Sequence, residues 1–249
     1  MKNLDSYITE KLVIGKNIIH KKIQVLTKDE LRSILEERLS KDKNADLNDI
    51  DVRLINNMSR LFYNLDPHNI KIDKWDVSQV EEMNYMFSYC KNFNSDLSKW
   101  NVSKVESMEG MFVNCKKFNS DLSNWKVFNV KNMVMMFDNC YNFNSDLSNW
   151  DVSKVEKMNY MFQGCNNFNS DLSNWDVSNV TEMRMMFDYC EKFNSDLSQW
   201  KTSKLKNAKS MFWDCPSFNR NLDNWDISNL QSMDFMFYNC KRIPKWYKK

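Results

Sequence analysis

Apolar residues recur along this chain with a constant period, which equals the interval from Trp75 to Trp100. A tryptophan opens each unit, a cysteine follows it at a fixed distance, and no insertion or deletion interrupts either series. A unit this short cannot bury its apolar face alone, so copies of it are expected to stack on one another. The two series are Trp75, Trp100, Trp125, Trp150, Trp175, Trp200 and Trp225, and Cys90, Cys115, Cys140, Cys165, Cys190, Cys215 and Cys240.

Each repeat combines two patterns. In one half, apolar residues are separated by three, three, one and three positions, which is typical of one face of a helix. Ser78 precedes this run, and Glu81, three residues later, completes the spacing of a helix-capping box. The other half is rich in turn-forming residues and predicts a short strand at residues 96–98. The apolar positions of the first complete repeat are Val80, Met83, Met86, Phe87 and Cys90.

These patterns predict an α/β solenoid, with one short parallel strand and one short helix per repeat. Eight frames of this length fill residues 50–249. The first frame (50–74) and the last (225–249) are atypical, as expected of terminal repeats, which have a neighbour on one side only.

Residues 1–49 lack the repeat and are expected to form an N-terminal capping segment. Residues 12–14 and 18–26 can pair as a β-hairpin across a glycine-containing turn. Thr27 and Glu30 have capping-box spacing and predict an amphipathic helix at residues 28–40. A separate docking element is the alternative to a cap.

The composition favours a globular chain without a general attraction to polyanions. The 249 residues are 42% hydrophobic, and 35 Lys and Arg against 33 Asp and Glu leave a net charge of +2. Nucleic-acid binding is therefore not expected, and the basic residues after Cys240 are interpreted as a solubilising end. No secretory signal, lipid anchor or transmembrane segment is visible, so we expect an intracellular monomer without membrane insertion.

Two rows of residues, the cysteines and a set of aspartates, could suggest a metal site. The cysteines stand alone in their frames and are expected to be reduced core residues rather than metal ligands or disulfides. The aspartate row must relieve its mutual repulsion. The side chains either splay into water or accept backbone amides at a turn, and the alternative is that they bind a row of calcium ions. No catalytic set is visible, and no cofactor is expected. The aspartate row is Asp96, Asp121, Asp146, Asp171 and Asp196.

Positions that vary between repeats are candidates for partner binding, because the invariant positions build the scaffold. An asparagine row from Asn94 to Asn219 is expected to form a ladder between coils. A row of variable aromatic and methionine residues provides the candidate contacts with another protein, since such residues anchor many interfaces. The alternative is that they seal one helix against the next. These candidates are Tyr85, Tyr89, Met135, Tyr160, Met185, Tyr189, Trp213, Phe235 and Tyr238.

The repeat at residues 150–174, WDVSKVEKMNYMFQGCNNFNSDLSN, resembles those of the BspA-like leucine-rich-repeat surface proteins, the domain also described as a mycoplasma lipoprotein domain. The shared positions are the tryptophan, Val-Ser-x-Val, Met-x-x-Met-Phe, the cysteine and Phe-Asn-x-x-Leu. The resemblance implies a leucine-rich-repeat-like, right-handed coil used for protein contact, which in bacterial members is usually adhesion at the cell surface. A non-enzymatic interaction scaffold is therefore expected, and a calcium-stabilised adhesive solenoid is the alternative.

Overall fold

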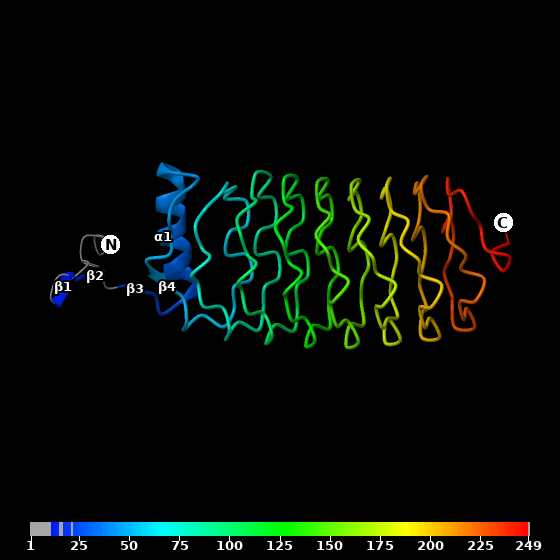
Figure 1. Cartoon of the computed structure of the whole chain (residues 1–249), viewed down its shortest axis with the longest axis horizontal. Helices are drawn as coiled ribbons and strands as arrows, with labels where there is room; N and C mark the ends of the chain where they lie inside the picture. The colour runs from blue at the N-terminus through cyan, green and yellow to red at the C-terminus, as the bar shows by residue number, and fades with distance from the viewer. Residues whose placement is uncertain (1–10, 15–16, 21, 249) are drawn as a thin grey trace.

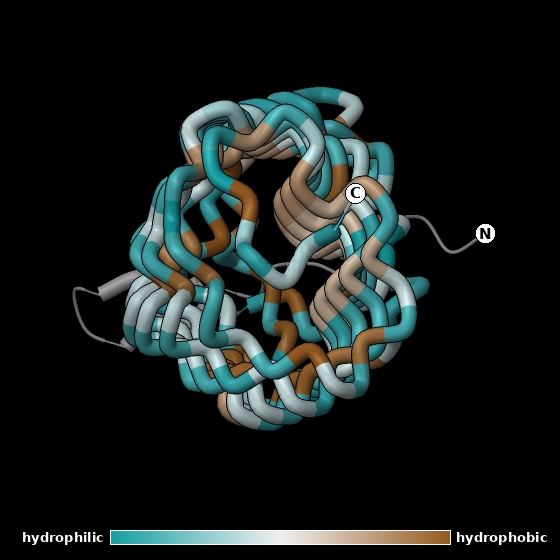
Figure 2. The backbone as a smooth tube through the Cα atoms, turned by 90° about the vertical axis from the view of Figure 1, so that its right-hand side faces the viewer, coloured by the Kyte–Doolittle hydropathy of each residue, from teal (hydrophilic) through white to brown (hydrophobic). Residues whose placement is uncertain are grey.

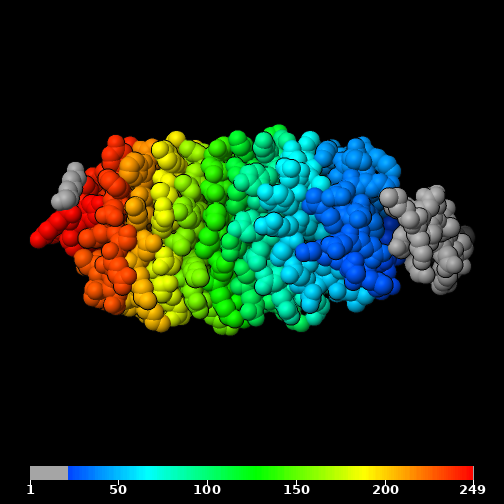
Figure 3. Space-filling model, turned by 180° about the vertical axis from the view of Figure 1, so that it is seen from behind, coloured from blue at the N-terminus to red at the C-terminus, as the bar shows by residue number. Residues whose placement is uncertain are grey.

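A stack of repeated coils, one for each sequence unit, occupies most of the molecule (Figure 1). The computed structural model describes residues 11–14, 17–20 and 22–248. Isolated parallel bridges join equivalent residues of successive repeats, from the pair Asn57 and Glu82 to the pair Asn207 and Ser232. Viewed along the long axis, the coils superimpose, so that residues of similar hydropathy lie behind one another (Figure 2). In the space-filling view each coil forms its own band along a rod (Figure 3).

Four backbone hydrogen bonds that run in the same direction join each coil to the next. In one interior coil, the Met108 N–H donates to the Asn132 carbonyl at 3.0 Å and the Phe112 N–H donates to Met136 at 2.9 Å. The donors are alternate residues, and each acceptor belongs to the following coil. Fewer bonds run the opposite way, and one that recurs joins the Glu106 N–H to the Glu81 carbonyl of the preceding coil at 2.9 Å. The coils therefore have an N–H side and a carbonyl side.

The segment expected to be helical in each repeat is a series of β-turns, so the prediction of one helix per repeat is wrong. In the first complete repeat, the Met86 N–H donates to Met83 at 3.2 Å and the Cys90 N–H donates to Phe87 at 3.0 Å. Tyr85 and Tyr89, the third residues of these turns, have φ values of 55° and 64°. This left-handed conformation suits the third position of a type II turn and interrupts a right-handed helix.

The predicted strand is also misplaced. Residues 96–98 lead into a turn, in which the Trp100 N–H donates to Leu97 at 3.0 Å. The parallel bridges lie instead at Glu82 and its equivalents, within the segment predicted to be helical. Parallel pairing between repeats is thus present, but as single bridges between turns.

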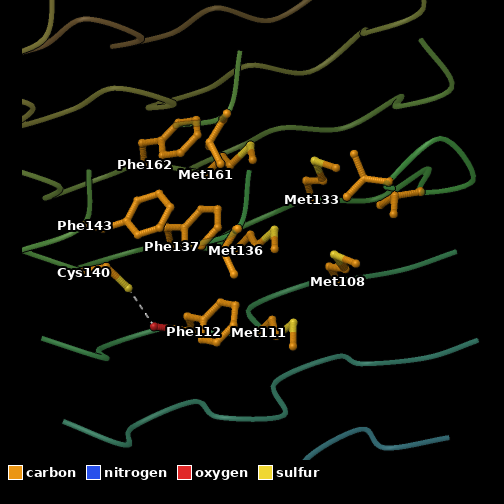
Figure 4. Close-up of a cluster of buried hydrophobic side chains, with 14 of the residues drawn as sticks. Met108, Met111, Phe112, Met133, Met136, Phe137, Cys140, Phe143, Met161 and Phe162 are labelled. Atoms are coloured by element: carbon orange, nitrogen blue, oxygen red, sulfur yellow. Dashed lines mark hydrogen bonds between the residues drawn. The ribbon is translucent and has the colours of Figure 1, made fainter. Parts of the chain in front are cut away.

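Aromatic, methionine and cysteine side chains fill the interior of the coils. The rings of Trp125 and Trp150 stack with centroids 6.4 Å apart and planes 2° from parallel. Phe112, Phe137 and Phe162 form a second stack beside the methionines (Figure 4). Each buried side chain of this size stabilises the fold by about 1.5 to 3 kcal/mol. Because the rings are covered by those of the next coil, the burial depends on stacking.

A helix and a short strand cover the N-terminal end of the stack. Helix α1 spans Lys28–Lys41, starts at Thr27, whose hydroxyl accepts the Glu30 N–H, and buries Leu35 with three other aliphatic residues. Strand β3 (Ile23–Gln24) pairs in parallel with β4 (Ile50–Asp51). The other three buried residues of α1 are Leu31, Ile34 and Leu39.

The expected hairpin segment contains two antiparallel strands. Strand β1 (Lys11–Ile14) pairs with β2 (Asn17–His20), and Leu12 lies opposite Ile19. Residues 15–16, which belong to the expected turn, lie outside the described residues. In the part of the chain that the structure describes, no helix is long and apolar enough to cross a lipid bilayer.

Candidate functional site

The variable candidate residues lie at the corners of the turns, on one face of the stack. Two positions in every coil adopt positive φ, and the second is directly preceded by a third variable position. We call the surface formed by these three rows the corner face. The first positive-φ row is Arg60, Tyr85, Gly110, Met135, Tyr160, Met185, Ser210 and Phe235. The second is Asn64, Tyr89, Asn114, Asn139, Gly164, Tyr189, Asp214 and Asn239, and the preceding row is Tyr63, Ser88, Val113, Asp138, Gln163, Asp188, Trp213 and Tyr238.

Tyr85 is largely occupied by contacts within the molecule. Its hydroxyl donates a hydrogen bond to Glu109, and the Arg60 guanidinium lies 5.5 Å from its ring centroid. A Cβ at Gly110 would clash with the Tyr85 ring, so the glycine leaves the space that the ring fills. Burial, followed by the bond to Glu109, raises the pKa of Tyr85 to about 12. Tyr85 therefore joins three coils and is only half-buried.

Tyr160 has a similar arrangement further along the stack. The Arg184 guanidinium lies 5.5 Å from its ring centroid. Tyr160, Met135 and Met185 are all half-buried at the first positive-φ position. Each of these residues is the corner of a turn, so the alternative that they seal one helix against the next does not apply.

Tyr89 and Tyr189 are the more accessible candidates on the central coils. Their exposed fractions are 42% and 48%. Both occupy the second positive-φ row, where other coils have Asn, Asp or Gly, the residues that tolerate this conformation best. A tyrosine here exposes an aromatic ring on a backbone that is fixed by bonds to the next coil. Tyr63, in the first coil, extends this set and lies 5.6 Å from Tyr89 in an edge-to-face contact.

The structure brings Trp213, Phe235 and Tyr238 together at the C-terminal end of the corner face. The Trp213 and Tyr238 rings stack at 4.3 Å, and the Phe235 ring meets Trp213 edge-on at 5.4 Å. Phe235 and Tyr238 are more than half exposed, whereas Trp213 is half-buried. The three residues come from two successive coils, and the period of the sequence could have indicated their proximity.

Two carboxyl groups in the central coils, the half-buried Asp138 and the buried Asp188, were not among the sequence candidates. Burial raises the pKa of both Asp138 and Asp188 to about 6, and a neighbouring aspartate adds to each shift. The Gln163 amide, from the coil between them, donates to Asp188 at 2.9 Å. The same position is occupied by serine, valine and tryptophan in other repeats. The appearance of an acidic residue at a position that is otherwise uncharged was the sequence signal that could have identified them.

The aspartate row is used for turn formation. The Asp121 carboxylate accepts the N–H of Ser123 at 2.9 Å, and each other member accepts the amide two positions further on. These bonds hold the pKa of Asp121 below its ordinary value, with the backbone amide as the first cause. An Asx-turn of this kind relieves charge by amide donation. Among the described residues, no three His, Cys, Asp or Glu side chains form a group that could hold a metal ion.

The remaining polar rows connect each coil to the one before it. The Cys140 thiol donates to the Phe112 carbonyl at 2.9 Å (Figure 4), and burial raises the pKa of the thiol well above its ordinary range. The Trp125 indole N–H donates to the Leu97 carbonyl at 2.9 Å. The asparagine ladder is confirmed: Asn119 accepts the N–H of the next asparagine at 2.8 Å. The seven cysteines carry no disulfide.

The chain matches the sequence profile of one protein family. The family described as "Mycoplasma protein of unknown function, DUF285" matches twice, over residues 30–150 and 131–248. No curated protein and no solved structure matches the chain.

Proposed function

The chain belongs to this family of mycoplasma-type proteins of unknown function, and on that premise we propose that it is a non-enzymatic scaffold that binds another protein through its corner face. The observation that carries the proposal is the exposure of three tyrosines, Tyr63, Tyr89 and Tyr189, at turn corners whose backbone is bonded to the next coil. Aromatic residues are preferred anchors of protein interfaces. Each buries a large area on binding and loses little conformational entropy, because its side chain has few rotatable bonds.

The backbone beneath these side chains supports such a role. The Tyr89 N–H donates to Val113 at 2.7 Å and the Tyr189 N–H donates to Trp213 at 2.9 Å. Each exposed ring is thus attached to a residue whose conformation is already fixed by the next coil. A preorganised surface loses little conformational entropy when it binds.

We propose that the stack is a leucine-rich-repeat-like solenoid related to the BspA-like surface proteins. The regular coils and their parallel bridges support this proposal. In this architecture one face provides repeated contacts while the interior is held constant. No cofactor, metal ion or catalytic step is part of the proposal, and the partner is a protein recognised mainly through apolar and aromatic contacts.

The matching experiment replaces the exposed tyrosines with the residue used at the same position elsewhere in the stack. The Tyr89→Asn and Tyr189→Asn double variant keeps a side chain that accepts positive φ, as Asn114 and Asn139 do. Proteins captured from a lysate of the source organism would be quantified by mass spectrometry for the wild-type chain and the variant. We expect about a tenfold loss of the specific partner, corresponding to about 1.4 kcal/mol.

The control is Phe128→Ser, which removes an exposed aromatic residue outside the corner face. Its equivalents in other repeats include Ser103 and Ser153, so the change restores the common residue. The control is expected to keep the partner. Equal capture by the tyrosine variant and the wild-type chain, with unchanged thermal unfolding, would reject the corner face as the binding surface.

A further inference from the structure

The hydrogen bonds between coils give the stack a polarity along its axis. In every coil the donors at alternate residues face the C-terminal end, and the carbonyls that accept them face the N-terminal end. Peptide dipoles that point the same way add up, as they do in a helix. The N-terminal end therefore displays carbonyl oxygens with partial negative charge, and the C-terminal end displays N–H groups with partial positive charge.

The carbonyls at the N-terminal end are covered by cations from helix α1. The Lys28 ammonium donates to the Ser59 carbonyl at 3.3 Å. The Arg32 guanidinium donates to the carbonyls of Leu61 at 2.9 Å and Tyr63 at 3.2 Å. In later coils the equivalent carbonyls accept the N–H groups of the preceding coil. The positive side chains thus replace the donors of a missing coil.

The N–H groups at the C-terminal end have no such cover. Met233, Phe235, Phe237 and Asn239 occupy the four donor positions of the last coil, and none of their N–H groups has an acceptor among the described residues. The Gln231 carbonyl, whose equivalents in earlier coils accept an N–H group of the following coil, also has no donor among the described residues. This edge has the hydrogen-bonding pattern to which a further coil would attach.

A pocket lies along this open edge. It has a volume of about 630 Å³ and is lined by the edge residues together with Tyr238, Ile243 and Tyr247. Phe235 and Tyr238 are 57% and 56% exposed. Asp234 and Lys248 are the charged residues of the lining. Apolar side chains therefore accompany the unpaired donors.

The segment after Cys240 folds back over the last coil at Leu222 and Asp223, away from the edge N–H groups. The Trp246 indole donates to the Leu222 carbonyl at 2.8 Å, which is the acceptor that the next tryptophan of the repeat series would use. The Lys245 N–H donates to Asp223 at 2.7 Å. The tail thus supplies the missing indole hydrogen bond and packs Trp246 and Tyr247 against the Phe237 ring. The N–H groups from Met233 to Asn239 that would bond a further coil stay without an acceptor among the described residues.

The tail also makes this end strongly basic. Four exposed cations follow the last cysteine, and no ion pair between described residues includes any of them. Asp234 is the acidic residue at the pocket. The positive end of the aligned peptide groups therefore coincides with a cluster of positive side chains. The four cations are Lys241, Arg242, Lys245 and Lys248.

We propose that the C-terminal end of the stack binds an acidic peptide segment of a partner protein, in the turn conformation that a further coil would have. The carbonyls of the segment accept hydrogen bonds from the four edge N–H groups, and one of its N–H groups donates to Gln231. Its apolar side chains enter the pocket beside Phe235 and Tyr238, and its carboxylates face the four cations. This mode is addition of backbone to an open edge, with specificity from the pocket and from charge.

A second copy of this chain does not fit the edge. Two C-terminal ends brought together would oppose N–H groups to N–H groups and cations to cations. The N-terminal end has the required carbonyls, but Lys28 and Arg32 occupy them and α1 covers the surface. The edge therefore selects a segment from a different molecule. The site is separate from the tyrosines of the central coils and does not depend on their role.

The test uses a peptide whose sequence, within this chain, forms the coil segment that accepts the four N–H groups of the coil before it. The peptide ESMEGMFVN reproduces residues 106–114, whose carbonyls accept the four donors of the preceding coil and which include Glu106 and Glu109. Binding of the fluorescein-labelled, end-capped peptide to the full chain is measured by anisotropy. A peptide with lysine at both glutamate positions is the matched probe for charge, and is expected to bind at least about tenfold more weakly.

Two protein variants locate the binding. In the first, the four cations of the tail are changed to glutamate, which is expected to weaken peptide binding at least about tenfold. In the second, Phe235→Ser and Tyr238→Ser introduce the residue found at the equivalent positions Ser210 and Ser88, with a similar loss expected. The control changes four exposed lysines on other coils to glutamate and is expected to bind normally: Lys99, Lys117, Lys126 and Lys201.

Amide exchange measured by NMR reports on the edge directly. The N–H groups of Met233, Phe235 and Phe237 are expected to exchange at least about tenfold more slowly in the presence of the peptide. The proposal is overturned by an absence of binding at millimolar peptide, by equal binding of the two peptides, or by binding that persists in the tail variant. Dimerisation of the chain in sedimentation velocity, with loss of peptide binding, would assign the edge to a second copy. Loss of the partner in the Tyr89 and Tyr189 variant with intact peptide binding would separate this site from the corner face.

Discussion

The two ends of the stack differ in how the backbone groups of their terminal coils are covered. At the N-terminal end, exposed carbonyls meet the ammonium of Lys28 and the guanidinium of Arg32, and α1 buries its apolar side against the first coil. At the C-terminal end, the Trp246 indole of the tail bonds the Leu222 carbonyl. Four N–H groups there have no acceptor among the described residues, and two aromatic rings are exposed. An edge of unpaired backbone groups is a template for further pairing. The difference indicates which end is a closed cap and which end is available for binding.

The largest expected effect on stability concerns the apolar side chains at the two ends of the stack. Leu35 is fully buried beneath the cap, so Leu35→Ala is expected to lower the free energy of unfolding by about 2 to 5 kcal/mol. Phe235→Ala at the open end is expected to cost less than about 1 kcal/mol, because the ring is more than half exposed. Urea unfolding followed by tryptophan fluorescence measures both. A similar cost for the two variants would show that the C-terminal end is closed.

The next comparison concerns the charged cover of the carbonyls. Arg32→Met keeps the length of the side chain but leaves the Leu61 and Tyr63 carbonyls without their donor. A loss of about 2 to 3 kcal/mol is expected, since hydrogen bonds to charged groups contribute more than neutral ones. Arg53→Met is the control, because Arg53 forms an ion pair with Asp51 and bonds no carbonyl of the edge. Equal unfolding midpoints for these two variants would contradict the capping role of Arg32.

The central coils differ from both ends in their pH dependence. Asp138 and Asp188 have pKa values raised from 3.8 to about 6, so the folded state binds protons more tightly than the unfolded state. Their contribution is present in full below about pH 4 and is lost as the pH rises through about 6. Between pH 7.5 and pH 5 we expect a stabilisation of about 2 kcal/mol after allowance for structural relaxation. Thermal unfolding across this range measures it.

The Asp188→Asn variant sharpens the same test. It is expected to remove about half of the pH dependence between pH 5 and pH 7.5. The control, Asp121→Asn, leaves it unchanged, because the pKa of Asp121 is held below its ordinary value. A pH dependence that both variants retain in full would assign the effect to other groups.

The smallest expected effect concerns calcium. The aspartates of the turn row already accept backbone amides, so adding calcium or a chelator is expected to shift the unfolding temperature by less than about 1 °C. The Asp121→Asn variant keeps an Asx-turn acceptor and is expected to unfold like the wild-type chain. A shift of several degrees with calcium, abolished by this variant, would favour the alternative of a calcium-stabilised solenoid.

Several features of the fold follow from local sequence signals. The Thr27 and Glu30 spacing predicts a helix at residues 28–40, and α1 occupies Lys28–Lys41. The asparagine ladder also follows from the sequence, because a polar residue that recurs in every repeat must find the same partner in each coil. These signals succeed because they depend on contacts that the residue type and the repeat specify by themselves.

The conformation of each repeat could not be read in the same way. Successive β-turns, each closed by a backbone bond between its first and last residues, place Met83, Met86 and Cys90 on the inside, at the same spacing as one face of a helix. The difference lies in the positive φ of Tyr85 and Tyr89. Neither residue is a glycine or an asparagine, so the sequence of this repeat gives no sign of the left-handed conformation. The bonds to the next coil impose it.

The candidate surface was predictable in location but not in detail. The variable row from Tyr85 to Phe235 does lie on one face, because positions separated by the repeat length are superimposed. Whether a residue of this surface is packed against the protein or exposed to solvent depends on side chains from neighbouring coils. Arg60 and Glu109 engage Tyr85, while Tyr189 is 48% exposed.

The bond from each tryptophan to a leucine of the preceding coil also constrains how such a chain can change in length. A tryptophan completes its hydrogen bond only with the coil before its own, as Trp150 does with Leu122 at 3.0 Å. Adding or removing a few residues inside a coil would misalign this bond and the thiol, asparagine and backbone bonds beside it. A whole unit can be gained or lost without disturbing any of them. The length of the stack is therefore quantised in steps of one complete repeat, and duplication of whole units is the natural route by which it grows.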